Sequence, residues 1–136
     1  VAPLVSAQSP GAAEANQRAY ALFSEGKYQE AAADYEKLLK DYPTDAIIGV
    51  GQIQLAFSYY FLGRFDDALA MLKKATSGPP LPPELQQVAD SLLPQILSAK
   101  AGVMPESDAK RKTTFQEAIA KFTEFITKYP NAEDLE

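Results

Sequence analysis

The chain has 136 residues, of which 46% are hydrophobic and 23% are charged, a composition typical of a folded globular domain that can bury a core. Its net charge of -5 argues against a nucleic-acid partner, because phosphate binding needs an excess of basic side chains. The sequence contains no cysteine and no histidine, which excludes disulfides, zinc–thiolate sites and histidine-dependent catalytic triads. We therefore predict that the protein is not an enzyme and holds no cofactor and no metal.

The N-terminal residues form an apolar stretch that is rich in alanine and proline. Residues 5–7, Val-Ser-Ala, fit the small-x-Ala pattern that signal peptidase cleaves. Residues 1–11 are thus predicted to be a disordered leader that could be a signal-peptide remnant, and the alternative is a plain flexible leader. No apolar run reaches the ~20 residues of a membrane-spanning helix, so no membrane span is predicted.

Helical periodicity then recurs along the whole chain. The second helix starts near Tyr28 and stops before Pro43, and Thr44 and Asp45 are candidate caps for the third. Pro94 lies inside the fifth helix, where one kinked helix is favoured over two short ones. Thr114 and Glu117 form a candidate capping box for the sixth helix, and residues 106–113 stay unassigned. The other five predicted helices span residues 12–25, 45–62, 65–76, 84–101 and 115–129.

One short phrase is repeated three times at fixed offsets. From the first copy to the second, glycine, aromatic, alanine and proline positions all shift by 37 residues, as in Gly26→Gly63 and Ala31→Ala68. From the second copy to the third, the shift is 50 residues, as in Ala68→Ala118 and Pro80→Pro130. A constant offset over several residue types indicates a helical-hairpin repeat protein.

These residues resemble the tetratricopeptide repeat family, whose unit is a helix-turn-helix of about 34 residues. The second copy fits best, and the third fits only in its second helix. The resemblance implies an all-α fold of three antiparallel helix pairs, stacked as a right-handed superhelix over residues 12–136. The three repeats would cover residues 12–43, 44–80 and 84–130. The matching positions of the second copy are Leu55, Ala56, Tyr59, Gly63, Phe65, Ala68, Leu72, Ala75 and Pro80.

The ends of two repeats carry a narrower resemblance. Asp41-Tyr42-Pro43 and Lys128-Tyr129-Pro130, with the run at residues 122–127, are similar to bacterial cell-envelope members of this family. Those members include the periplasmic Tol-Pal coordination protein and the lipoprotein subunit of the outer-membrane assembly machine. The resemblance implies a periplasmic or cell-envelope protein, and the alternative location is the cytoplasm.

In this family the first helix of each pair lines a concave groove that binds proteins or peptides. The resemblance places three amide side chains and five aromatic rings there, without the basic set that clamps an acidic tail, so an apolar helix or extended peptide is the expected ligand. The alternative is that Phe57, Tyr60 and Phe61 pack on the fifth helix. The candidate site residues are Asn16, Tyr20, Phe23, Ser24, Ile53, Gln54, Phe57, Tyr60 and Phe61, with Gln17 and Val50 beside them.

The leading functional prediction is a non-catalytic protein-interaction scaffold that belongs to a larger exported repeat protein. The alternatives are a homo-oligomerisation module and a regulatory repeat segment of a larger enzyme or sensor. Residues 110–112, the basic cluster Lys-Arg-Lys, are expected to be a solvated loop. The last helix has more apolar surface than one neighbour can cover, so we expect another molecule, a homodimer partner or further repeats on it. Its large apolar side chains are Ile119, Phe122, Phe125 and Ile126.

Overall fold

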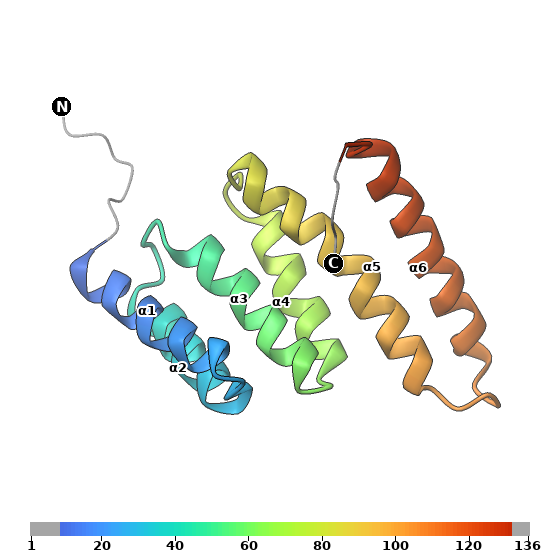
Figure 1. Cartoon of the computed structure of the whole chain (residues 1–136), viewed down its shortest axis with the longest axis horizontal. Coiled ribbons are helices and arrows are strands. Elements are labelled where there is room, and N and C mark those ends of the chain that lie inside the picture. Colours follow the sequence, from blue (N-terminus) through green and yellow to red (C-terminus); the bar gives the residue numbers. More distant parts are fainter. Residues whose placement is uncertain (1–8, 132–136) are drawn as a thin grey trace. The chain divides into compact units, whose positions relative to one another are not determined.

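The structure is a computed structural model that describes residues 9–131, and these residues form six α-helices and no strand (Figure 1). The predicted all-α fold is confirmed. The chain divides into two compact units, residues 1–80 (unit 1) and residues 81–136 (unit 2). Unit 1 contains α1 (Pro10–Ser24), α2 (Tyr28–Asp41), α3 (Ile48–Phe61) and α4 (Phe65–Ser77), and unit 2 contains α5 (Pro83–Val103) and α6 (Ala109–Lys128).

Helix α1 begins earlier than the sequence pattern predicts. The Ser9 hydroxyl caps it by accepting a hydrogen bond from the Ala12 amide at 3.2 Å. Pro10 occupies the first turn, where its missing N–H costs nothing and its fixed φ favours the helix. The predicted leader was therefore too long, since residues 10 and 11 are helical. Residues 1–8, with the predicted cleavage pattern at residues 5–7, lie outside the described residues.

The first two hairpins turn in the same way. Gly26 and Gly63 have φ values of +79° and +77°, in the left-handed region where a Cβ is strained. The amide after each glycine donates to a carbonyl in the last turn of the preceding helix, from Lys27 to Leu22 at 2.9 Å and from Arg64 to Tyr59 at 2.8 Å. This is the Schellman geometry that glycine favours at a helix C-terminus, and it confirms both predicted turns.

Within unit 1, α2 packs between α1 and α3, and α4 packs on α3. Small residues stand where these helices pack together, since Ala31 and Ala68, at matching positions of the first two repeats, are both fully buried. Gly51 has the same role. A Cβ placed on it would lie 3.2 Å from Cδ2 of both Leu38 and Leu39 in α2. Gly51 therefore lets α2 and α3 approach closely.

Helix α3 starts three residues later than predicted, because Asp45 does not cap it and binds two backbone amides outside the helix. Its carboxylate accepts hydrogen bonds from the Ile47 amide at 3.0 Å and from the Ser9 amide at 2.9 Å. The Ser9 amide is the main cause of a lowered pKa for Asp45. Asp45 therefore ties the start of α1 to the α2–α3 loop instead of capping α3.

Unit 2 is one hairpin of longer helices. Helix α5 runs without a break through the buried Pro94, which confirms the single-helix alternative. The predicted capping box of α6 is wrong. The Asp108 carboxylate caps α6 by accepting from the Lys110 amide at 2.9 Å, and the Thr114 hydroxyl donates to the Lys110 carbonyl from inside the helix. The basic cluster at residues 110–112 thus lies in the first turn of α6 and not in a loop. The right-handed stacking of the three pairs stays a prediction.

Candidate interaction surface

Seven aromatic rings gather at the end of unit 1 that carries the Gly26 and Gly63 turns. They come from the last two turns of α1 and α3 and from the first residues of α2 and α4. Each ring has its centroid within 4.7–6.4 Å of at least one other ring of the set. We call this set the aromatic cluster. Its members are Tyr20, Phe23, Tyr28, Phe57, Tyr60, Phe61 and Phe65.

Phe23 and Phe61 are the centre of the aromatic cluster. Phe61 stacks on Tyr28 at 4.7 Å with an interplanar angle of 15°, and it meets Phe23 edge-on at 5.8 Å. Both geometries are favourable arrangements of aromatic quadrupoles and contribute about 0.5–1.5 kcal/mol per pair beyond area burial. The cluster therefore joins the two hairpins of unit 1 and fixes the orientation of its outer rings.

The aromatic cluster is only partly shielded from solvent. Tyr20 is 52% exposed and Phe61 is 50% exposed. Phe23, Phe57 and Tyr60 are half-buried, so each belongs both to the packing and to the surface. A half-exposed ring held by neighbouring rings offers apolar area with little conformational freedom left to lose on binding.

The other predicted site residues divide into three kinds. Ser24 is exposed beside the cluster, and Gln54 is half-buried. Ile53 is fully buried, so its assignment to an accessible surface is wrong, and it belongs to the core. Asn16 is half-buried, with a side-chain oxygen that is shielded from solvent and has no hydrogen-bond partner among the described residues. Gln17 is exposed and Val50 is half-buried.

Two rings of this surface were not predicted from the sequence. Tyr28 and Phe65 each follow a turn glycine by two positions, and this spacing was used only as a repeat signature. Because the Schellman turn brings the start of one helix beside the end of the previous one, these rings face the last-turn aromatics of α1 and α3. The same spacing, read together with the aromatics before the glycine, could have identified them.

Charged side chains beside the aromatic cluster are already paired. The Lys27 ammonium lies 3.0 Å from the Glu25 carboxylate, and the Arg64 guanidinium lies 2.9 Å from the Asp67 carboxylate. Arg64 also lies over the Tyr59 ring at 4.4 Å. These two cations are therefore not free to clamp a carboxylate of a ligand.

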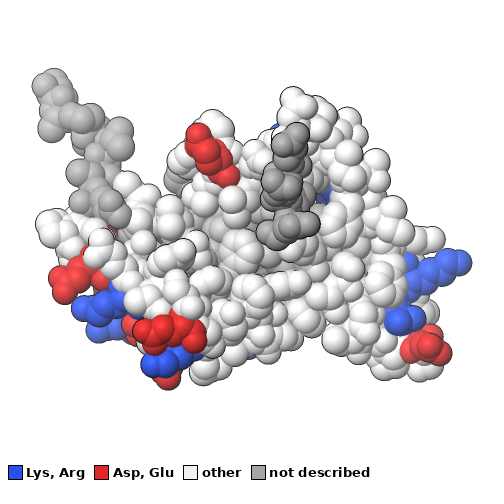
Figure 2. Space-filling view, in the orientation of Figure 1, with Lys and Arg blue, Asp and Glu red and all other residues white. Residues whose placement is uncertain are grey.

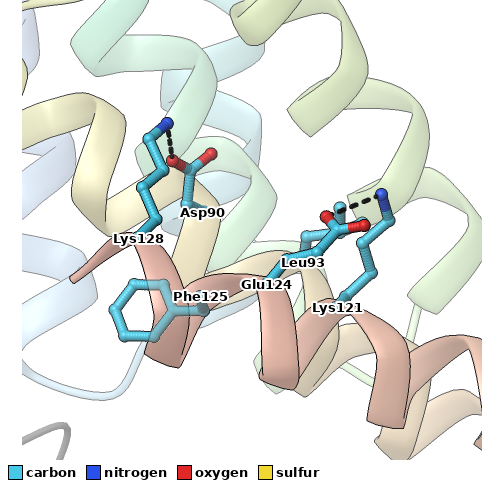
Figure 3. A pocket seen from close by; sticks show the side chains of 6 residues that line it. All are labelled: Asp90, Leu93, Lys121, Glu124, Phe125 and Lys128. Carbon is cyan, nitrogen blue, oxygen red and sulfur yellow. Dashed lines mark hydrogen bonds and ion pairs between the residues drawn. The ribbon is translucent and has the colours of Figure 1, made fainter. Parts of the chain in front are cut away.

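Unit 2 has a small open cavity of about 170 Å³ between α5 and α6 (Figure 3). Asp90 accepts hydrogen bonds from the Lys128 ammonium at 2.9 Å and the Tyr129 hydroxyl at 2.7 Å. On the other side of the cavity the Lys121 ammonium pairs with the Glu124 carboxylate at 3.2 Å. The polar groups of this cavity are thus paired with one another. They indicate a contact that holds α5 and α6 together more than a ligand site. The lining residues are Asp90, Leu93, Lys121, Glu124, Phe125 and Lys128.

A second cavity, of about 200 Å³, lies between α1 and α2 in unit 1 and is mostly polar. In residues 9–131, no three acidic side chains are placed to hold a metal ion. No helix in that same part of the chain combines the length and the apolar character needed to cross a membrane.

Paired helices with Schellman turns, small residues at close approaches and a constant offset define a helical-repeat protein of the tetratricopeptide type. The family described as YfiO, an outer membrane lipoprotein, matches residues 10–134. The chain belongs to this family. Its membership confirms the predicted location in the bacterial cell envelope and the predicted resemblance to envelope lipoproteins. No curated protein and no solved structure matches the chain.

Proposed function

We propose that this protein is a non-catalytic scaffold of the cell envelope that binds an apolar helix or an extended peptide of another protein on its aromatic cluster. The observation that carries the proposal is the pair of half-exposed rings, Tyr20 and Phe61, held by five further rings. Large aromatic side chains on a rigid support dominate many protein interfaces, because they bury much area at low entropic cost.

The charges around the cluster favour an apolar ligand over an acidic one. Lys27 and Arg64 are the cations next to the rings, and each is neutralised by a carboxylate of its own turn. A ligand carboxylate would have to displace Glu25 or Asp67 before it gained an ion pair. Apolar side chains meet no such competition, so the surface selects them by contact area.

Tyr20 is a cleaner probe of binding than Phe61. Tyr20 has one ring contact, with Phe23 at 6.3 Å, whereas Phe61 contacts three rings within 5.8 Å. Tyr20→Ala should therefore leave the stability of unit 1 almost unchanged. Phe61→Ala should lower both the stability of unit 1 and the affinity for the ligand. Its affinity must therefore be measured well below the Tm of the variant.

The test uses a photo-reactive amino acid at position 20 in the chain produced in bacterial cells. Light-induced cross-links from position 20 should capture a protein segment that carries large apolar side chains. The matched control is the same amino acid at Ala33, an exposed position of α2. The captured segment is then synthesised as a labelled peptide and titrated with purified protein.

Tyr20→Ala should lower the affinity for the labelled peptide about tenfold or more, since central aromatic anchors often contribute ~2 kcal/mol to binding. Glu14→Ala, at an exposed position of the same helix, should leave the affinity unchanged. Equal capture at positions 20 and 33, or equal affinity for the Tyr20→Ala protein, would remove the aromatic cluster as the binding surface.

A further inference from the structure

The aromatic cluster combines apolar rings with hydrogen-bond donors that the protein itself does not use. Three of its seven rings are tyrosines, Tyr20, Tyr28 and Tyr60. None of their hydroxyls forms a hydrogen bond within residues 9–131, and none of the three is shielded from solvent. The cluster therefore offers O–H groups as well as apolar faces to a ligand.

Hydrogen-bond acceptors beside the aromatic cluster are less available than these donors. The Glu25 carboxylate is paired with Lys27, and the Asp67 carboxylate is paired with Arg64. The side-chain oxygen of Asn16, one helical turn before Tyr20, is shielded from solvent. A ligand rich in backbone N–H groups would have to share the two carboxylates with their cations. A ligand that offers carbonyl oxygens and few N–H groups meets no such competition.

A proline-rich segment in the polyproline II conformation has this chemistry. Proline has no backbone N–H, and the polyproline II helix makes no internal hydrogen bonds, so its carbonyl oxygens point outward along its whole length. An α-helix uses most of its carbonyls internally. Tyrosine hydroxyls that an α-helix covered would lose water without gaining an acceptor, which is unfavourable. The donors of the cluster therefore favour the proline-rich segment over the α-helix.

The two most exposed rings of the aromatic cluster suit one turn of such a ligand. Tyr20 and Phe61 both contact Phe23, with centroids at 6.3 and 5.8 Å from it. One turn of polyproline II helix is about 9 Å long, so two prolines three positions apart reach both rings. Tyr20 lies at 17° to the Phe23 plane and Phe61 at 62°, so the two rings face different directions and form an angled surface. Helix α3, which carries Phe61, has no charged residue, and Figure 2 shows an uncharged surface over it.

We propose that the aromatic cluster binds a proline-rich segment of a different protein in the polyproline II conformation. Prolines three positions apart pack on Tyr20 and Phe61, and carbonyl oxygens of the segment accept hydrogen bonds from the tyrosine hydroxyls. Aromatic-lined surfaces bind proline-rich segments in several unrelated recognition domains, because the ligand is already extended before it binds and loses little entropy. This inference rests on the proposed function, since it uses the same surface and narrows the class of ligand.

The chain has a proline-rich segment of its own, but this segment is a poorer ligand. Residues 79–83 read Pro-Pro-Leu-Pro-Pro, and Pro82 has polyproline II angles, with φ at -54° and ψ at 149°. Pro79 and Pro80 follow the end of α4, roughly 20 Å along the helix from the cluster residue Phe65 at its start. The segment therefore cannot cover the cluster of its own copy. Binding between copies would join two different surfaces and extend into open chains.

The test uses two labelled peptides that are mirror images of each other. One contains about ten L-prolines, roughly three turns of polyproline II helix, and the other contains the same number of D-prolines. Their composition and apolar area are identical, and only the hand of the helix differs. Fluorescence anisotropy measures the affinity of each peptide for the purified chain. The L-proline peptide should bind about tenfold tighter or more.

Substitutions of Tyr20 separate the hydrogen bond from the ring contact. Tyr20→Phe keeps the ring and should lower the affinity for the L-proline peptide about fivefold, as expected for one lost hydrogen bond. Tyr20→Ala also removes the ring and should lower the affinity further. Tyr42→Phe is the matched control and should change nothing, because Tyr42 lines the polar cavity between α1 and α2 and lies outside the cluster. Circular dichroism of each variant confirms that it is folded.

A third labelled peptide distinguishes failure of this inference from failure of the proposed function. It consists of leucine and glutamine in the pattern of an amphipathic helix. If this peptide binds in a manner that Tyr20→Ala weakens, while the L-proline peptide does not bind, the inference is wrong and the proposed function stands. If Tyr20→Ala changes the affinity for none of the three peptides, both are wrong.

Two further results would overturn the proposal. Equal binding of the L-proline and D-proline peptides would show that apolar contact alone, without the conformation of the ligand, determines the affinity. Tight binding of a peptide with the sequence of residues 77–84, together with a concentration-dependent association of the chain that Tyr20→Ala abolishes, would assign the cluster to a second copy.

Discussion

The two units connect their helices by different physical means. In unit 1 the helix ends are joined by left-handed glycines and by stacked aromatic rings around the two turns. In unit 2 the α5–α6 turn has no left-handed glycine, and a carboxylate caps α6 instead. There the opposite end of the hairpin is tied by Asp90, which binds Lys128 and Tyr129.

This difference separates what the repeat requires from what one hairpin adds. Small residues at the close approach of two helices are common to both units, since Ala31, Ala68 and Ala118 are all buried. The type of turn and the contacts that join the helix ends differ between the two units. Close backbone approach is therefore the feature that the repeat preserves, while the ends of the hairpins carry the surfaces that differ.

The largest expected effect comes from enlarging a shared small position. Ala68→Leu inserts three carbon atoms where the structure has no space, because Ala68 is fully buried between helices. Overpacking of this kind costs about 1–3 kcal/mol of unfolding free energy. Ala118→Leu in unit 2 should cost a similar amount, and the denaturant midpoint of each variant measures both.

Ala70→Leu is the control for this prediction, because Ala70 lies in the same helix and is exposed. It should change stability by less than ~0.5 kcal/mol. Equal losses for Ala68→Leu and Ala70→Leu would show that the repeat register is wrong, and a harmless Ala118→Leu would show that unit 2 does not share it.

The next effect concerns the polar tie of unit 2. Burial opposes the ionisation of Asp90, but hydrogen bonds from Lys128, Tyr129 and Gln86 outweigh it and lower its pKa. Asp90→Ala removes these bonds, and we expect a loss of about 1–2 kcal/mol in unit 2, since hydrogen bonds to charged groups contribute ~1.5–3 kcal/mol and this site is partly exposed. Asp90→Asn keeps an acceptor and should lose less.

The sign of the pH dependence follows from the lowered pKa of Asp90. Its contribution is complete above the ordinary carboxyl pKa of ~3.9 and is lost as the pH falls through the lower folded value. Acid titration followed by the NMR signals of the Tyr129 ring should therefore show unit 2 weakening only below about pH 4. An Asp90→Ala protein with an unchanged acid transition would contradict this assignment.

Much of the helix and turn pattern of unit 1 was predictable, because residues close together in the sequence determine it. A glycine between two periodic runs predicts a Schellman turn, and Gly26 and Gly63 both form one. The start of α3 was not predictable, because Asp45 binds Ser9, which is 36 positions away in the sequence. The burial of Ile53 was missed for the same reason, since helical register does not tell which neighbour covers a residue.

In unit 2 the sequence contained two competing signals. Thr114 and Glu117 have the spacing of a capping box, yet α6 begins earlier because Asp108 caps it. A local motif identifies a helix start only if no better cap precedes it. The aromatic cluster shows the opposite case, since most of its rings were named from the sequence and only their contacts required the structure.

A smaller effect distinguishes two buried tyrosines of unit 1. The Tyr59 hydroxyl donates to the Glu36 carboxylate at 2.7 Å, and burial, with this bond, raises the pKa of Tyr59 to about 12. The Tyr35 hydroxyl is fully buried and has no partner among the described residues. Tyr59→Phe should cost about 1 kcal/mol, whereas Tyr35→Phe should be neutral or stabilising, because it removes an unpaired polar group. Thermal unfolding of both variants measures the contrast, and a destabilised Tyr35→Phe protein would indicate a partner such as a buried water.

The smallest effects test the turns and have opposite signs. Gly63→Ala places a Cβ at a φ of +77°, where it is strained even though no neighbour lies within 4 Å, and we expect a loss of about 1 kcal/mol. Gly102 lies in the last turn of α5, its φ is not in the left-handed region, and it also has open space around it. Gly102→Ala should therefore gain about 0.5–1 kcal/mol, because alanine restricts the unfolded chain and favours the helix. If chemical denaturation shows the same sign for both variants, conformation at the turn is not what separates the first two hairpins from the third.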